Sequence, residues 1–114
     1  MAAEEHQVSR AGPRVVVTLP AEIDAMNADD IREALLSETG PGVTTLIVDM
    51  SGTTFCDSAG VHAVITAYRQ AARTGIEVRL VATTVRRVFR LIGADQLMPT
   101  FPTLEAALAD TPAA

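Results

Sequence analysis

The sequence predicts one α/β domain: a mixed sheet of four to five strands with an N-terminal β-hairpin and about four helices packed on it. Its 114 residues give room for one hydrophobic core but not for two domains. Short β-branched or apolar runs alternate with segments whose apolar residues recur at helical spacing, which implies parallel strands joined by right-handed crossovers. We expect residues 8–110 to form the domain, between a flexible leader (1–7) and a C-terminal tail (111–114).

The N-terminal hairpin is predicted from two strand-like segments around a turn. Residues 6–10 form the first strand and the β-branched residues 14–19 the second. Between them, residues 11–13 read Ala-Gly-Pro, which is typical of a turn.

The first helix is predicted to follow Asn27, a residue type that favours the N-cap. Apolar residues at helical spacing stand behind it, and the glycine-proline-glycine segment at 40–42 is expected to end the helix. Its inward-facing residues are Ala28, Ile31 and Leu35.

The centre of the sheet is predicted at residues 46–48, a continuous apolar run typical of a parallel strand covered on both faces. A polar loop at 51–54 follows, and a long amphipathic helix begins near Ser58 and ends at Gly75. The apolar stripe of this helix is expected to comprise Val61, Val64, Ile65, Tyr68 and Ala72.

The C-terminal part is predicted to contain a strand at 77–82, a helix capped by Thr84 and ended by Gly93, a short strand within 98–101, and a last helix capped by Thr103. In the first of these helices the apolar residues are expected to face inward and the arginines to face water. The inward set is Val85, Val88, Phe89 and Ile92, and the outward set is Arg86, Arg87 and Arg90. The last helix presents Leu104, Ala107 and Leu108.

Composition excludes several functions. Nine arginines, no lysine and 14 acidic residues give a net charge of −5, and the chain has three phenylalanines, one tyrosine and no tryptophan, so we expect no nucleic-acid binding. No apolar run approaches the length of a membrane span, and the N-terminus lacks the pattern of a secretory signal. A single cysteine, Cys56, fits a reducing compartment, so we expect a soluble cytoplasmic protein. His6 and His62 fall in no ligand spacing, so no metal is expected.

The loop between residues 49 and 60 is the best candidate for a functional site, because function gathers where parallel strands run into helix N-termini. Hydroxyl groups near a positive helix end could bind or accept a phosphoryl group. Ser58 is the best placed, at the expected first position of the helix with small Ala59 and Gly60 behind it. Judged on local sequence alone, the alternative is that Ser58 only caps the helix.

The same loop carries a longer pattern. Asp49 closes the strand, Ser51 and Phe55 follow at fixed spacing, and Asp57-Ser58-Ala59-Gly60 completes the string. This string closely resembles the signature of STAS domains, in particular of bacterial anti-sigma factor antagonists. A second family element, ahead of the first helix, corresponds to residues 22–24, although Pro20-Ala21 stands where the family has a glycine.

The resemblance implies a regulator without catalysis or a cofactor of its own. The unmodified antagonist would bind an anti-sigma factor serine/threonine kinase and thereby free a sigma factor for transcription. Phosphorylation of Ser58, using ATP held by the kinase, would separate the two proteins, and a metal-dependent, PP2C-type phosphatase would restore the hydroxyl. The chain would be a monomer or weak dimer. The residues expected to meet the partner are Asp24, Ser51, Thr53, Asp57, Ala59, Gly60 and His62.

The sequence also allows other functions. Within the family the chain could be a scaffold subunit of a stress-signalling complex or a regulatory module detached from an anion transporter. As an enzyme it could be a serine hydrolase that uses Ser58 with His62 one turn later, although Cys56 stands where a nucleophile elbow needs glycine. Cys56 itself is either a redox-sensitive thiol or a small buried hydrophobe. The exposed arginines 86, 87 and 90 are either a solvated face or part of an interface.

Overall fold

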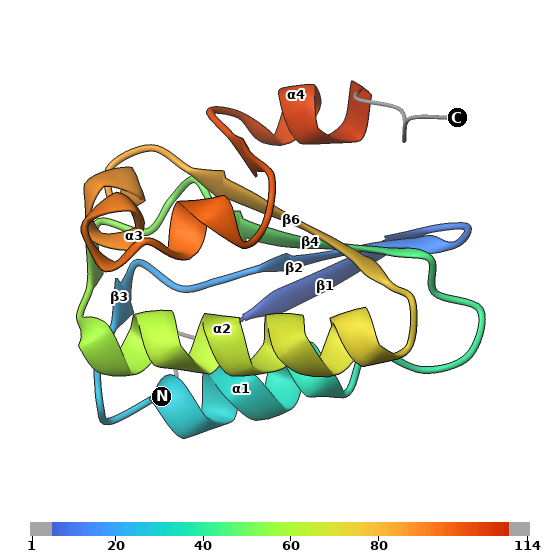
Figure 1. Cartoon of the computed structure of the whole chain (residues 1–114), viewed down its shortest axis with the longest axis horizontal. Helices are drawn as coiled ribbons and strands as arrows, with labels where there is room; N and C mark the ends of the chain where they lie inside the picture. Colours follow the sequence, from blue (N-terminus) through green and yellow to red (C-terminus); the bar gives the residue numbers. More distant parts are fainter. Residues whose placement is uncertain (1–5, 110–114) are drawn as a thin grey trace.

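The computed structural model describes residues 6–109, whose main feature is a five-stranded mixed sheet with the order β1-β2-β4-β6-β7. Helices α1 and α2 lie on one side of this sheet and α4 on the other (Figure 1). The predicted fold class is therefore confirmed. Residues 1–5 of the predicted leader and the whole predicted tail fall outside the described residues, whereas Gln7, expected in the leader, opens β1.

The sheet begins with the predicted hairpin, formed by β1 (Gln7–Ala11) and β2 (Arg14–Thr18), which pair antiparallel. Gly12 has φ +63°, a left-handed conformation that the tight turn needs and that glycine adopts without strain. The other pairings are parallel. They join β2 to β4 (Thr45–Met50), β4 to β6 (Glu77–Ala82), and β6 to β7 (Thr100–Phe101). All six residues of β4 are buried, as expected for the central strand.

The main core lies between the sheet and the helices α1 (Ala28–Leu36) and α2 (Ser58–Arg73). Fully buried side chains such as Leu46 and Leu80 from the sheet meet Val64 from α2. Each large aliphatic side chain of this kind contributes about 1.5–3 kcal/mol when it leaves water. The result is a rigid layer that carries the N-terminus of α2.

The opposite face of the sheet is covered by α4 (Leu104–Ala109), whose Ala107 packs on Val16, Ile47 and Val81. Thr103 caps α4 as predicted, because its Oγ1 accepts a hydrogen bond of 3.0 Å from the Ala106 amide. The sequence pattern therefore identified both the helix and its cap.

Arg79 is fully buried beneath α4. Its Nη1 donates to the Ala107 carbonyl oxygen at 2.6 Å, and its Nε and Nη2 donate to the Glu77 carboxylate, each at 3.2 Å. The guanidinium lies 6.0 Å from the ring centroid of Phe101. Arg14 donates in the same way to the Leu108 carbonyl, at 2.7 Å. Two arginines thus satisfy carbonyl groups at the C-terminal end of α4, where positive charge is favourable.

Helix α1 begins where predicted and Asn27 occupies its N-cap position, but the Asn27 side chain makes no capping hydrogen bond. The Asn27 side chain turns backward instead: its Oδ1 accepts from the Asp24 amide at 3.0 Å, and its Nδ2 donates to the Glu22 carbonyl at 2.9 Å. These bonds fix the turn that leads into α1. The helix ends at Leu36, so the glycine-proline-glycine segment at 40–42 belongs to the following loop and does not stop the helix.

Two expected core positions are wrong. In α2, Ala71 is buried and Ala72 is exposed. Helix α1 packs beside α2, so the buried face of α2 includes Ala71 and not Ala72. In α3 (Arg86–Ile92), Ile92 is 50% exposed, because the chain turns at Gly93 and Ala94, in the 3-10 helix η1 (Ala94–Gln96), enters the core instead. The N-cap of α3 is Val85, so Thr84 does not cap that helix.

The arginines of α3 are exposed as predicted, and Gly93 ends the helix with φ +86°. Gly75, with φ +78°, likewise follows the end of α2. None of the helices in the described part of the chain is long and apolar enough to span a membrane.

Candidate functional site

The candidate site lies at the carboxyl end of the central strand, where β4 passes through a loop and a two-residue strand, β5 (Phe55–Cys56), into α2. β5 pairs in parallel with a second short strand, β3 (Glu22–Ile23). This pairing, which the sequence pattern did not reveal, ties the loop to the segment that precedes α1. Residues from two distant parts of the chain are thereby brought to one end of the molecule (Figure 1).

The start of the loop is held by hydrogen bonds to its own side chains. The Asp49 carboxylate accepts from the Ser51 amide at 3.0 Å and from the Thr18 hydroxyl at 3.4 Å. The Thr53 hydroxyl donates to the Pro20 carbonyl at 2.8 Å. Thr53 is fully buried and shapes the loop from inside; that it belongs to the region a partner meets stays a prediction. Ser51 is exposed on the loop surface.

Asp57, and not Ser58, caps α2. The Asp57 carboxylate accepts a hydrogen bond of 3.1 Å from the Gly60 amide, and its negative charge is favourable at this helix end. Ser58 therefore occupies the first helical position, as predicted, and is exposed. Among the described residues, none forms a hydrogen bond with its hydroxyl. The alternative that Ser58 serves only as a cap is thus wrong, and its hydroxyl is open to another molecule.

The first turn of α2 packs directly on the β3–β5 pair at Gly60. A Cβ atom added at Gly60 would lie 2.6 Å from the Cys56 sulfur and 2.7 Å from Cγ2 of Ile23, closer than real side chains approach. Gly60 is buried, so it contributes to the site through this fit and offers no surface to a partner. The pattern Asp-Ser-small-Gly therefore has a packing reason as well as a chemical one.

Asp24 reaches the site through the β3–β5 pairing. The Asp57 amide donates to the Ile23 carbonyl at 3.2 Å, so the chain positions of Asp24 and Asp57 are adjacent. Asp24 is half-buried, and its carboxylate accepts from the Met26 amide at 2.8 Å. Two acidic residues thus border the exposed serine.

Cys56 lies beneath the loop and is only 4% exposed. Burial, together with the nearby charge of Asp57, raises the pKa of its thiol to about 12. A thiol in this state is protonated at neutral pH and is a poor nucleophile. Of the two interpretations offered by the sequence, the buried hydrophobe is therefore the one that the structure supports.

A groove of about 550 Å³ runs between the N-terminal halves of α1 and α2, and Ser58 lies at its edge. His62 lines it one turn further along α2, and Asp29 and Arg32 line it from α1. The remaining lining residues are Ala25, Ala28, Ala59, Ala63 and Thr66. Ala59 and His62 thus share this surface with Ser58.

The arrangement does not support hydrolysis. No hydrogen bond joins Ser58 to His62, and within residues 6–109 no acid orients the histidine ring. An activated serine nucleophile needs both contacts. The described residues also contain no group of three or more histidine, cysteine, aspartate or glutamate side chains that could hold a metal ion.

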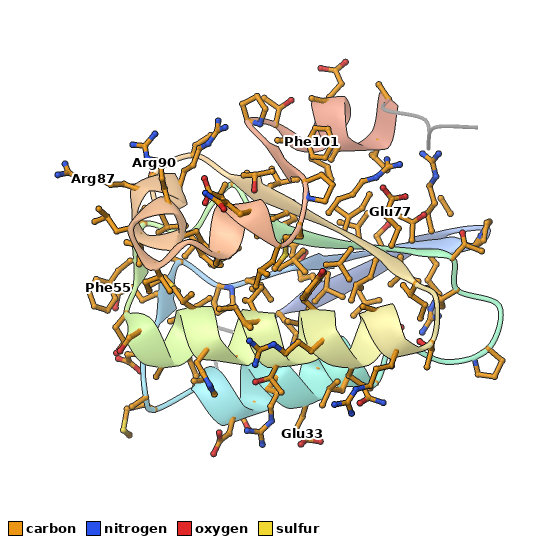
Figure 2. All side chains as sticks on the ribbon, viewed as in Figure 1. Glu33, Phe55, Glu77, Arg87, Arg90 and Phe101 are labelled. Atoms are coloured by element: carbon orange, nitrogen blue, oxygen red, sulfur yellow. The ribbon has the colours of Figure 1, made fainter. Side chains whose placement is uncertain are left out.

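Two exposed apolar side chains were not predicted as contact residues, although Phe55 is part of the family string. Phe55 is 51% exposed and Met26 is 89% exposed. Phe55 projects outward at the end of the molecule where α2 begins (Figure 2). Its apolar character within a polar loop was the available signal, because exposed aromatic residues often anchor protein interfaces.

A family model of the STAS domain matches residues 3–107. The chain belongs to the STAS domain family. Among its relatives, the anti-sigma-F factor antagonist RsfA of Mycobacterium tuberculosis is 30% identical over an alignment of 103 residues that covers 85% of this chain and 79% of RsfA.

Solved STAS structures superpose closely on this chain. An anti-sigma factor antagonist from Mycobacterium paratuberculosis has a TM-score of 0.75 and 28% identity, with 91% of this chain and 90% of that one covered. Unphosphorylated SpoIIAA, also an anti-sigma factor antagonist, has a TM-score of 0.75 and 28% identity, with 91% and 93% covered. The Bacillus cell fate determinant SpoIIAA has also been solved in its phosphorylated form, which matches with a TM-score of 0.69 and 27% identity, with 91% and 96% covered. These relatives are regulators, in agreement with the prediction that this STAS protein is not an enzyme.

Proposed function

We propose that this STAS protein is an anti-sigma factor antagonist that binds an anti-sigma factor kinase while Ser58 is unmodified and leaves it when Ser58 is phosphorylated. The observation that carries this proposal is the state of the serine hydroxyl. It is exposed at the first position of α2, while Asp57 takes over the capping role that would otherwise occupy it. The similarity to RsfA, and to SpoIIAA in both phosphorylation states, supports the same function.

The small residues around Ser58 leave room for the active site of a partner kinase. Ala59 adds only a methyl group beside the hydroxyl, and the side-chain position of Gly60 faces inward against Cys56 and Ile23. A kinase bound here can bring the γ-phosphate of its ATP to Ser58 Oγ, with ADP leaving and the hydroxyl proton passing to a base on the kinase. The chain itself then needs neither a metal nor a nucleotide.

Binding before phosphorylation needs an attractive surface, and the apolar residues near the site provide one. Phe55 projects at the end of the molecule where α2 begins (Figure 2), and Met26 directly follows Ala25, which lines the same groove as Ser58. Partner contact would remove the exposed area of both side chains from water. Aromatic anchors of this kind often cost more than about 2 kcal/mol of binding energy when truncated. The exposed Ser51 would add hydrogen bonding at the rim.

Release on phosphorylation follows from the charge added. A phosphoserine carries about 1.5 to 2 negative charges at neutral pH, and this charge is welcome at a helix N-terminus when water surrounds it. The free domain therefore stays folded. In the complex the same dianion loses water and lies beside Asp57 and Asp24, and an opposed like charge costs several kcal/mol. Since about 1.4 kcal/mol changes affinity tenfold, one phosphate is enough to separate a micromolar complex.

A PP2C-type phosphatase is proposed as the second partner. Ser58 is exposed, so a metal-dependent phosphatase can reach the phosphoserine of the free domain and hydrolyse it with water, which restores the hydroxyl and releases inorganic phosphate. The cycle then depends on the balance of kinase and phosphatase activity.

The proposal is tested by affinity capture from an extract of the native cells, with the unmodified protein as bait, followed by addition of ATP and magnesium. We expect the captured kinase to add about 80 Da to Ser58, as located by mass spectrometry. Ser58→Ala should still bind but stay unmodified. Ser9→Ala, which removes an exposed serine hydroxyl from β1, outside the site, is the matched control and should be modified normally. Modification at another residue, or capture of no ATP-dependent kinase, would contradict the proposal.

A further inference from the structure

The proposed function assigns no specific role to His62, although this residue lies in the candidate site. It lies four residues after Ser58 on α2, where side chains of a helix are neighbours with Cβ atoms about 5–6 Å apart. Helical side chains also lean toward the N-terminus of their helix, which directs the imidazole toward Ser58. Both residues line the groove between α1 and α2, and both are exposed.

Arg32 lines the same groove from the other side, on α1. Its guanidinium is engaged only by exposed carboxylates, at 3.2 Å from Asp29 and 3.6 Å from Glu33, whose side chains are 85% and 73% exposed. Such ion pairs are worth about 0–1 kcal/mol and exchange readily. A phosphate dianion accepts two parallel hydrogen bonds from a guanidinium and is the stronger partner.

We propose that the groove between α1 and α2 is a phosphate site that acts in cis: once Ser58 is phosphorylated, His62 and Arg32 bind its phosphate within the same molecule. The inference rests on the proposed function only in that it needs phosphate on Ser58. The bound phosphate is pulled from the tip of α2 into the groove, so the phosphorylated state differs from the free one in the shape and charge of its docking face. The same contacts favour the fully ionised phosphate.

The charges around the groove allow this exchange. Asp29 and Glu33 on α1 oppose the phosphate, as do Asp57 at the N-cap and Asp24 beside it, but Arg32 can leave the two α1 carboxylates without burying them. On the far side of His62, Arg69 and Arg73 line an adjoining groove of about 250 Å³. They add positive potential at longer range but lie about three to four turns from Ser58 along α2.

The test is a phosphorus NMR titration of the full chain with phosphoserine incorporated at position 58 during translation, which requires no partner kinase. Opposite charges favour the dianion, so we expect phosphate ionisation at a lower pH than in a phosphoserine peptide, by roughly 0.5 to 1 pH unit. His62→Ala and Arg32→Gln should each return the midpoint toward the peptide value. Arg69→Gln, which removes one positive charge from the same helix away from Ser58, is the matched control and should leave it nearly unchanged.

A second measurement follows the Arg32 Nε–H signal in nitrogen-correlated NMR spectra of the otherwise unaltered protein. It should shift when the residue at position 58 is phosphoserine and not when it is serine. Equal titration midpoints in the unaltered chain, His62→Ala and Arg32→Gln, with an unmoved Arg32 signal, would overturn the proposal. If the kinase of the proposed function failed to modify Ser58, that function would fail while this titration still gave its own answer.

Discussion

Gly60→Ala tests the close packing that positions the serine. The added Cβ would lie 2.6 Å from the Cys56 sulfur and 2.7 Å from Cγ2 of Ile23, both on short buried side chains that cannot swing away. Overpacking of this kind costs about 1–3 kcal/mol, and alanine returns at most about 1 kcal/mol through its helix propensity. We therefore expect a net loss of about 1–2 kcal/mol in the free energy of unfolding, together with displacement of the start of α2.

Urea denaturation followed by far-ultraviolet circular dichroism measures this loss. Gly40→Ala is the matched control, because a Cβ there meets nothing within 4 Å, and its stability should stay within about 0.5 kcal/mol of the unaltered protein. The cost of Gly60→Ala should shrink in a Cys56→Ala background, where the sulfur no longer opposes the new methyl group. A Gly60→Ala protein as stable as the original would refute the packing argument.

Two further predictions concern the buried side chains of Cys56 and Arg79. Burial raises the pKa of the Cys56 thiol from 9.0 to about 12, so between these pH values the folded chain keeps a proton that the unfolded chain loses. The contribution of the buried thiol to the free energy of unfolding is therefore complete below pH 9 and declines as the pH rises from 9 toward 12. The stability difference between the original and Cys56→Ala, measured in urea at several pH values, should accordingly fall by up to about 1.4 kcal/mol per pH unit in that window; a constant difference would contradict it. Arg79→Met removes the donor to the Ala107 carbonyl and should cost about 1–3 kcal/mol with faster amide exchange in α4, whereas unchanged exchange there would show that this arginine does not hold the helix.

The sequence pattern was most successful where periodicity and a strong local signal agree. The β-branched run of β2, the apolar run of β4 and the long stripe of α2 each placed an element within a residue or two. The local capping preference also located the start of α4 at Thr103.

It failed where a tertiary contact overrides a local preference. Asn27 stands at the N-cap position of α1, yet its side chain bonds to the preceding turn, and Thr84 lies one residue before Val85, the N-cap position of α3. The β3–β5 pair consists of only two residues per strand, too few to show alternation, and it depends on contacts between residues more than 30 positions apart. The burial of Thr53 and the fit at Gly60 follow from that pair and could not be foreseen without it.

The candidate serine was identified from the sequence because its signal is a string of residues and not a periodicity. The string could not reveal that Asp57 caps the helix and that the Ser58 hydroxyl is thereby left exposed. The groove shared with His62 and Arg32 was equally hidden, since it joins two helices that are separated in the chain.

The most direct measurement is the affinity of the captured kinase for two forms of this protein, one with serine and one with phosphoserine at position 58, determined by isothermal titration calorimetry in the same buffer. A dianion against the acidic rim should weaken binding by several kcal/mol, or at least about a hundredfold, while circular dichroism shows both forms equally folded. Equal dissociation constants for the two forms would contradict the account, because the charge on one exposed oxygen would then not decide whether the proteins remain bound.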